Sequence, residues 1–261
     1  MVPFRVQWLY KRLLSSSFRQ SLSSVLENPA DFHRGVLSKA ASNRKGEAVR
    51  LKLKSGRVAI CRSFMSFYIF DEIFIQQVYD TGLAAPRTLI DIGANVGLFT
   101  LWARERWPGA FVLAIEPEPS NHADLDMMIS ENKLDRVEAI RAAVTDTGDP
   151  VTLYRHHANT GGHSIVERTG DAITVPGYTL GAALAALPEG VCDFLKVDCE
   201  GAENEILRGM TSDIARNISA IVYEPSPKLY SVTELNSRLE ELGFQVRPHR
   251  DLVLAVRQKA A

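Results

Sequence analysis

The chain has 261 residues, 46% of them hydrophobic, a length and composition that suit one large α/β domain with a small extension. Its 30 basic and 31 acidic side chains leave no global positive field to attract nucleic acid, so we expect no nucleic-acid partner. No apolar run approaches the roughly 18 residues that would indicate a transmembrane segment.

The three cysteines, Cys61, Cys192 and Cys199, are too few and too scattered for a disulfide framework. They also lack the paired spacing of a zinc site. The sequence therefore predicts reduced thiols in a cytoplasmic protein.

The first 50 residues are predicted to be helical or irregular. The opening stretch "MVPFRVQWLYKRLLSSSFRQSL" is basic and lacks the unbroken apolar core of a secretory signal. Its apolar residues could share one helical face: Phe4, Trp8, Leu9, Leu13 and Leu14. Two alternatives follow, a weak peripheral membrane contact and a helix that packs onto the protein. We favour packing, because one short basic stripe is a weak membrane signal.

The next segments predict a hairpin and then a helix. Residues 49–63, "VRLKLKSGRVAICRS", alternate apolar and polar residues on both sides of the turn pair Ser55-Gly56. Residues 71–82, "DEIFIQQVYDTG", have a helical apolar spacing, with Gly82 as the expected end. We divide the chain into a helical and hairpin extension over residues 1–70 and a second domain over residues 71–261.

From Arg87 onward, short apolar strands alternate with helices, a pattern typical of a mostly parallel sheet covered on both faces. The predicted strands are 88–92, 111–116, 137–144, 194–198 and 220–224, with two further pieces at 151–155 and 173–175. The predicted helices are 96–107, 120–132, 202–210 and 232–242. The last two strands, 244–247 and 252–256, are predicted to pair antiparallel at one edge. The predicted fold is therefore a doubly wound α/β sheet.

The stretch "TLIDIGANVGLF" joins the first strand of this sheet to its helix. Asp91 falls near the end of the strand, where ligands bind in such folds. Gly93 permits a tight turn and close approach of the backbone, and Gly97 permits close packing of the helix start. The helix N-terminus offers free amide donors to an electron-rich group.

The next strand ends at Glu116, which lies 19 residues after Gly97, and an acid there can accept both hydrogen bonds of a ribose diol. A dinucleotide site would need G-x-G-x-x-G, but Asn95 takes the place of the second glycine. The Asp91 carboxylate would repel a pyrophosphate and would suit the cationic amino-acid end of S-adenosylmethionine, directly or through water. These residues favour S-adenosylmethionine over NAD(P), with a Rossmann-like NAD(P)-dependent oxidoreductase as the alternative.

Four segments, "LIDIGANVGLFT", "AIEPEPSNHADL", "FLKVDCEGAENEILRGM" and "AIVYEP", resemble the FkbM-type methyltransferases in order and spacing. The most specific is "KVDCEGAE", residues 196–203, which is similar to the family signature K-[IV]-D-x-E-G-A-E. The resemblance covers about residues 71–244. It implies a class I methyltransferase fold with a seven-stranded sheet and dependence on S-adenosylmethionine. One departure is Gly181, where the family often has an acid, which puts the capping of the following helix in doubt.

The family resemblance further implies O-methylation of a hydroxyl on a sugar, a glycolipid or polysaccharide, or a secondary metabolite. An alcohol is a weak nucleophile, so a base within hydrogen-bond reach would help. Asp198, at the end of the fourth main strand, is the leading candidate, with Glu200 two residues later. Two carboxylates this close could raise the pKa of one of them. The alternatives are that they bind a divalent cation or that they cap the following helix.

Other candidates follow from position on the same edge of the sheet. Glu224 ends the fifth main strand and is a candidate acceptor contact or a plain surface acid. The segment "YRHHANTGGHSI" offers His163 as an auxiliary base and Asn159 and Ser164 as substrate contacts. Class I enzymes often hold adenine at the end of the third strand, here Ala143 and Val144. We expect no metal, because adjacent histidines in this segment would point in opposite directions. Lys196 is expected to contact another carboxylate.

Overall fold

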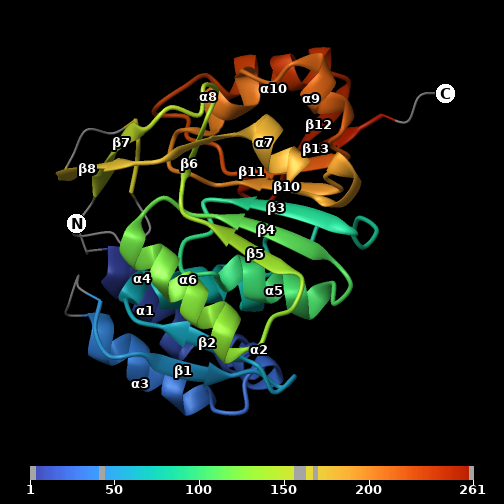
Figure 1. Ribbon diagram of the computed structural model, residues 1–261. Helices are drawn as coiled ribbons and strands as arrows, with labels where there is room; N and C mark the ends of the chain where they lie inside the picture. The colour runs from blue at the N-terminus through green and yellow to red at the C-terminus, as the bar shows by residue number, and fades with distance from the viewer. Residues whose placement is uncertain (1–3, 41–44, 156–162, 167–169, 259–261) are drawn as a thin grey trace.

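The computed structural model describes residues 4–40, 45–155, 163–166 and 170–258. Its centre is a seven-stranded sheet in the order β12-β13-β11-β10-β3-β4-β5 (Figure 1). All strands run parallel except β13, which is antiparallel to both neighbours. The strands are β3 (Thr88–Ile92), β4 (Phe111–Ile115), β5 (Val137–Ile140), β10 (Phe194–Val197), β11 (Ala220–Tyr223), β12 (Phe244–His249) and β13 (Leu252–Arg257). The predicted doubly wound, mostly parallel seven-stranded sheet is confirmed.

Alternate residues of each strand enter two different cores, as the pleat of a sheet requires. Leu89, Val112 and Phe194 join one core, and their neighbours Ile90, Leu113 and Leu195 join the other. Helices α5 (Leu98–Arg106) and α6 (Pro119–Glu131) lie on one side of the sheet with the N-terminal elements. Helices α7 (Leu180–Ala185), α8 (Glu203–Arg208), α9 (Ser212–Arg216) and α10 (Val232–Glu241) lie on the other (Figure 1).

The N-terminal part consists of α1 (Phe4–Leu14), α2 (Ser16–Val25), α3 (Pro29–Ala40), the antiparallel pair β1 (Val49–Lys52) and β2 (Val58–Cys61), and α4 (Phe64–Phe70). The hairpin prediction is confirmed. The predicted helix over 71–82 is wrong: a helix begins at Phe64, continues as the π-helical segment η1 (Asp71–Ile75), and stops before Gln77, whose φ is +53°. Ser63 and Ser66 form a capping box that starts the helix earlier than the apolar spacing suggested.

Helix α1 packs onto the fold. Trp8 is 7% exposed, stacks edge-on against Phe64 and donates its ring N–H to Asp71. Arg12 forms an ion pair of 2.7 Å with the same buried carboxylate. The predicted apolar face of this helix is therefore only partly buried: Trp8 belongs to the core, whereas Leu14 is 62% exposed. In the described part of the chain, no helix has the length and apolarity needed to cross a bilayer.

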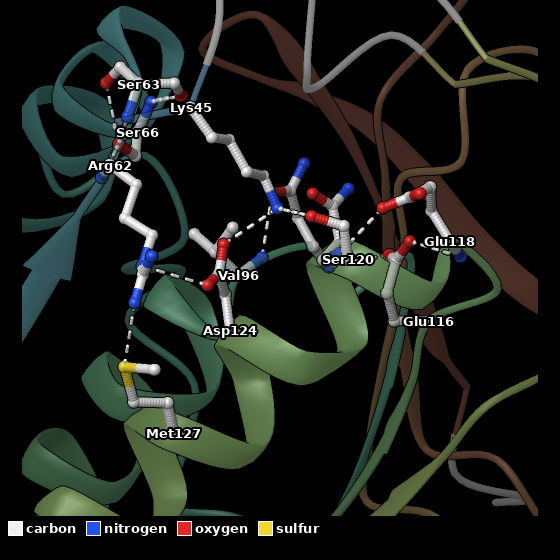
Figure 2. Close-up of polar contacts among 12 residues, drawn as sticks. Lys45, Arg62, Ser63, Ser66, Val96, Glu116, Glu118, Ser120, Asp124 and Met127 are labelled. Atoms are coloured by element: carbon white, nitrogen blue, oxygen red, sulfur yellow. Dashed lines mark hydrogen bonds and ion pairs between the residues drawn. The ribbon is translucent and has the colours of Figure 1, made fainter. Parts of the chain in front are cut away.

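The extension is fastened to the start of α6 by a small ion-pair network (Figure 2). Lys45 Nζ lies 2.7 Å from Asp124 Oδ2 and 2.9 Å from Ser120 Oγ. Arg62 Nε lies 3.2 Å from Asp124 Oδ1. Because α6 begins directly after the strand that carries Glu116, this network connects the extension to the ligand-binding edge of the sheet.

We expect Asp124→Asn to lower the free energy of unfolding by about 2 kcal/mol, because Lys45 and Arg62 would both lose their carboxylate partner. This value lies between those of exposed and of buried ion pairs. Urea denaturation measures the loss. Asp126→Asn on the same helix is the control, since the Asp126 side chain is 59% exposed and only pairs with His122. Equal stability of the two variants would contradict the expectation.

The predicted strand over 137–144 is wrong as one element. The structure divides it into β5 and β6 (Ala143–Thr145), and β6 leaves the main sheet to pair with β9 (Gly177–Thr179). The reason is that the neighbouring strand β4 ends at Ile115, so no partner remains for the backbone beyond Ile140. The pieces at β7 (Val151–Arg155) and β8 (Asp171–Val175) form a separate antiparallel pair.

Two short helices, α7 and α9, were not predicted. The doubt about capping at Gly181 is resolved, because Thr179 caps α7 by accepting a hydrogen bond from the backbone N–H of Ala182. The four predicted main helices occur as α5, α6, α8 and α10, with ends displaced by one or two residues at most sites. The predicted antiparallel pair of final strands is confirmed as β12–β13.

Candidate functional site

Two cavities meet at the carboxyl ends of β3, β4 and β10, the edge where parallel sheets bind ligands. We call the first, of about 540 Å³, the rim cavity, and the second, of about 1030 Å³ including space open to solvent, the acidic cavity. Four residues line both: Gly93, Asn95, Asp198 and Glu200. Two ligands bound in the two cavities would therefore meet at these residues.

The glycine turn is shaped by its neighbours. Gly93 has a φ of +74°, and a Cβ on it would lie 1.8 Å from the carbonyl oxygen of Asp198, so only glycine fits. This contact brings the turn after β3 against the turn after β10. Gly97 also has a positive φ, and a Cβ there would lie 2.8 Å from Leu125 of α6. Gly97 thus permits the close packing of α5 on α6, and it lines neither cavity.

Glu116 lies at the end of β4 with 5% exposure and faces the rim cavity. Its Oε2 accepts from the backbone N–H of Asn95 at 2.8 Å, and its Oε1 accepts from that of Glu118 at 2.9 Å. These two bonds fix the carboxylate and leave each oxygen able to accept one more hydrogen bond. Burial raises the pKa of Glu116 to about 7. A ligand with two adjacent hydroxyl groups suits this arrangement.

Asp91 lines neither cavity. Its side chain is fully buried, its Oδ2 accepts from Thr100 at 2.7 Å, and its Oδ1 lies 3.0 Å from Lys196 Nζ. The two residues are register partners on adjacent parallel strands, so their side chains lie side by side on one face. The predicted contact of Lys196 with a carboxylate is confirmed. Both carboxylate oxygens of Asp91 face partners inside the protein, and this geometry disfavours a direct contact of Asp91 with a ligand.

Lys196 links this pair to the cavities. Its ammonium donates to the carbonyl oxygen of Gly93 at 2.8 Å and lies 3.5 Å from Asp198 Oδ2. Burial alone would lower the pKa of Lys196, but the carboxylates of Asp91 and Asp198 raise it above its ordinary value. The lysine lines the acidic cavity and is therefore a fixed positive charge beside the point where the two cavities join.

Asp198 and Glu224 interact at this point through a hydrogen bond between their carboxyl groups. Burial opposes ionisation of Asp198, but Lys196 and hydrogen bonds from Glu224 and Tyr79 hold its pKa below the usual range. The charge of Asp198, together with burial, raises the pKa of Glu224 far above its usual range. The pair thus keeps one proton at neutral pH, on Glu224. A coupling of Asp198 with a second acid occurs with Glu224, which follows the neighbouring strand β11.

Neither Asp198 nor Glu200 caps the following helix. Helix α8 begins at Glu203, and its N-cap residue Ala202 has no side-chain cap. Glu203 itself accepts hydrogen bonds from the backbone N–H groups of Cys199 and Gly201, at 2.7 and 2.9 Å. Glu200 is exposed, has a φ of +54° and lines both cavities. The capping alternative for the two acids is therefore wrong.

The other predicted residues divide between the cavity and its surroundings. Ala143, Val144 and His163 line the rim cavity. Ser164 is buried, its hydroxyl donates to the carbonyl oxygen of Glu200 at 2.7 Å, and its backbone pairs with Tyr154. The hydroxyl of Ser164 therefore holds a loop in place and lines neither cavity, unlike the substrate contact we predicted. Asn159 lies outside the described residues.

The acidic cavity contains residues that the sequence did not indicate. Glu72 of η1, Tyr79 and Asp251 join Glu224 and the shared acids around it, while Met65, Ile69, Val78 and Leu98 contribute apolar surface. Glu72 has its pKa raised to about 7, chiefly by burial. No motif marked Glu72 or Tyr79, because both come from a segment interpreted as a plain helix. Among the described residues, no three His, Cys, Asp or Glu side chains are grouped to hold a metal ion.

Comparison with known proteins points to one family. The model of the methyltransferase FkbM domain matches residues 91–246, more than half of the chain. Methyltransferase sdnD of Sordaria araneosa is 29% identical over 219 residues, which cover 70% of this chain and 83% of the relative. Methyltransferase 1 of Beauveria bassiana (strain ARSEF 2860) is 25% identical, covering 70% and 82%. Among solved structures, methyltransferase FkbM from Methylobacillus flagellatus KT aligns with a TM-score of 0.47 and 14% identity, covering 97% of this chain and 58% of that one.

Proposed function

Because this chain belongs to the methyltransferase FkbM domain family, we propose that it transfers a methyl group from S-adenosylmethionine to a hydroxyl oxygen of a small molecule or glycan. The observation that carries the proposal is the junction of two cavities at Asp198, one suited to a nucleoside and the other lined with acids. The family favours this reaction over the nicotinamide-dependent alternative.

The residues of the rim cavity fit S-adenosylmethionine. Glu116 offers two fixed oxygens to a ribose diol, and the apolar surface of Ala143 and Val144 suits the adenine ring. Asp198 and Glu200 place negative charge at the far end, where a cationic sulfonium and ammonium would be favoured. When bound, the cofactor supplies an electrophilic methyl group.

We expect Glu116→Gln to weaken S-adenosylmethionine binding by roughly 100-fold, because hydrogen bonds to a charged acceptor contribute about 1.5–3 kcal/mol each. The wild-type protein should also lose affinity as the pH falls through about 7, where Glu116 takes up a proton. Calorimetric titration between pH 6 and pH 8 measures both effects.

The Glu116→Gln variant is the control for ionisation of the ligand. Residue 116 cannot titrate in this variant, so any pH dependence of its binding comes from the cofactor or from other groups of the protein. Glu138→Gln on the exposed side of β5 should bind like the wild type. Identical pH dependence in the wild type and Glu116→Gln would remove Glu116 from the cofactor site.

The acidic cavity is the proposed acceptor site. Carboxylates are strong hydrogen-bond acceptors for hydroxyl groups, and Asp198, Glu200, Asp251 and Glu72 outnumber the one lysine of the lining, Lys196, which disfavours anionic acceptors. Glu224 keeps its proton and adds a hydrogen-bond donor. The apolar wall of Met65, Ile69 and Val78 gives the cavity a second, non-polar side. We therefore propose a neutral or cationic acceptor with several hydroxyl groups and an apolar portion, such as a sugar-bearing lipid or a secondary metabolite.

In the proposed reaction Asp198 is the base. As the oxygen–carbon bond forms and the carbon–sulfur bond breaks, the hydroxyl proton becomes strongly acidic, so an ionised carboxylate can accept it even with a lowered pKa. Glu224 keeps its own proton and can donate a hydrogen bond to Asp198 or to the acceptor. Lys196 keeps Asp198 ionised before transfer.

The test is incubation with methyl-labelled S-adenosylmethionine and a panel of acceptors. The panel contains neutral glycosides, glycolipids and polyketide-like alcohols, each with a phosphorylated or carboxylated counterpart. We expect label on oxygen in the neutral compounds and little in the anionic ones. Label on nitrogen or carbon, or a preference for the anionic counterparts, would contradict the proposed acceptor. Absence of S-adenosylmethionine binding would contradict the function itself.

A further inference from the structure

A tyrosine from outside the matched family region reaches the proposed base. Tyr79 is 4% exposed, and its hydroxyl donates to Asp198 Oδ2 at 3.0 Å. The family match begins only at residue 91, so Tyr79 comes from the chain that precedes the family domain. Burial, followed by the charge of Asp198, raises the pKa of Tyr79 well above its ordinary value, so the hydroxyl remains a donor.

The position of Tyr79 is fixed on several sides. Its ring packs edge-on against Phe99 of α5 with the centroids 4.7 Å apart. The backbone just before it is held by the hairpin β12–β13: His249 Nε2 lies 3.1 Å from the carbonyl oxygen of Val78, and Arg250 donates to that of Gln76. The hydroxyl is thus directed at Asp198 by contacts from α5 and from the β12–β13 hairpin.

The backbone that leads to Tyr79 is unusual. It passes through the π-helical segment η1 and then through Gln77, a non-glycine residue with a φ of +53°. Both features cost free energy, and both are found preferentially at functional sites. Here they end the helix early enough for Glu72 and Tyr79 to line the same cavity.

We propose that Tyr79 is a positioning residue for methyl transfer, holding the Asp198 carboxylate in a fixed orientation toward the acceptor hydroxyl. This inference rests on the proposed function. It also makes the segment from α4 to Tyr79 part of the active site, although the family match does not include it.

Other charged and titratable groups act on Asp198, and they set the sign of the expected effect. They are Lys196, Glu224, Glu72, Glu203 and Cys199. Of these, Lys196 and the protonated Glu224 favour the ionised carboxylate, as the Tyr79 hydroxyl does, whereas charge on Glu72 or Glu203 opposes it. Removal of the Tyr79 hydroxyl should therefore raise the pKa of Asp198 and free its orientation.

The experiment compares Tyr79→Phe with Tyr223→Phe. Tyr223 is also buried, and its hydroxyl donates to Asn236 at 2.6 Å, away from both cavities. Carbon-13 NMR of labelled aspartate carboxyls, with the Asp198 signal assigned by its absence in Asp198→Asn, gives the titration midpoint. We expect a rise of about one pH unit in Tyr79→Phe and no change in Tyr223→Phe. With an acceptor in hand, kcat should fall about tenfold in Tyr79→Phe at unchanged S-adenosylmethionine affinity.

An unchanged midpoint in Tyr79→Phe, an equal shift in Tyr223→Phe, or a shifted midpoint with wild-type kcat would each overturn the proposal. The carboxyl titration requires no acceptor, so it tests the Tyr79 contact by itself. Failure of the wild-type protein to methylate any acceptor would contradict the proposed function, and is distinguishable from an unchanged titration.

Discussion

Replacement of Asp198 by asparagine should lower kcat for methyl transfer by about 1000-fold, within the range that general-base catalysis contributes. Asparagine has nearly the same shape and can still accept the hydrogen bond from Tyr79, but it cannot take the proton of the acceptor hydroxyl. Affinity for S-adenosylmethionine should fall far less than kcat, because the ribose contacts of Glu116 and the carboxylate of Glu200 remain. Single-turnover transfer of labelled methyl and calorimetric binding measure the two quantities.

Asp198→Asn has a second expected effect, on Glu224. The largest cause of the raised pKa of Glu224 is the charge of Asp198, so the pKa of Glu224 should fall in this variant. Carboxyl NMR measures the change without an acceptor. Asp213→Asn is the matched control for activity, since the side chain of Asp213 is 82% exposed and pairs only with the nearby Arg216. If Asp198→Asn retained half of the wild-type kcat, Asp198 would not be the base.

Replacement of Lys196 by methionine should lower the free energy of unfolding by about 3–5 kcal/mol, the usual cost of removing one partner of a buried ion pair. Methionine fills a similar volume, so the loss comes from the charge of Asp91, which is fully buried and would keep only Thr100 as a partner. Urea denaturation measures the difference. The same variant should raise the pKa of Asp198, since the charge of Lys196 is the largest of the influences that lower it.

The double variant Asp91→Asn/Lys196→Met is the control for this interpretation. It removes both charges, so it should be more stable than Lys196→Met alone. The pKa of Lys196 in the folded protein is raised above its ordinary value. The charge of Lys196 therefore stabilises the folded state fully below about pH 10.4, and this stabilisation is lost only as the pH rises through the pKa of the folded protein. The cost of Lys196→Met should therefore be constant between pH 7 and pH 9. A single variant as stable as the wild type would contradict the importance of the pair.

Much of the fold was predictable from local pattern. Strands β3, β4, β10 and β11 are short apolar runs buried on both faces, and this burial leaves a direct record in the sequence. The glycine turn and Glu116 were also predictable from local sequence. A backbone with positive φ favours glycine, and an acid directly after a buried strand lies at the edge where ligands bind. The start of α4 was missed because the capping box of Ser63 and Ser66 outweighed the apolar spacing after it.

The candidate site was only partly predictable. Asp198 and Glu224 were placed on the same edge because the ends of parallel strands meet there, but their coupling depends on strand order, which the sequence does not state. Asp91 and Ser164 were assigned to ligands, whereas the structure turns the first toward Lys196 and the second toward the backbone of Glu200. The sequence states which side chains carry a carboxylate or a hydroxyl. The partner toward which such a side chain points depends on how the surrounding elements pack.

The sequence by itself determined that this is a parallel-sheet α/β protein with a nucleoside-type turn, because strand burial and backbone conformation are local properties of a few neighbouring residues. Only the tertiary structure decided that Tyr79 and Glu72 belong to the acidic cavity. Tyr79 is 119 residues from Asp198, and the two meet because the segment that follows η1 packs against the sheet. Contacts across such separations depend on how whole elements pack, and a single stretch of sequence carries no record of them.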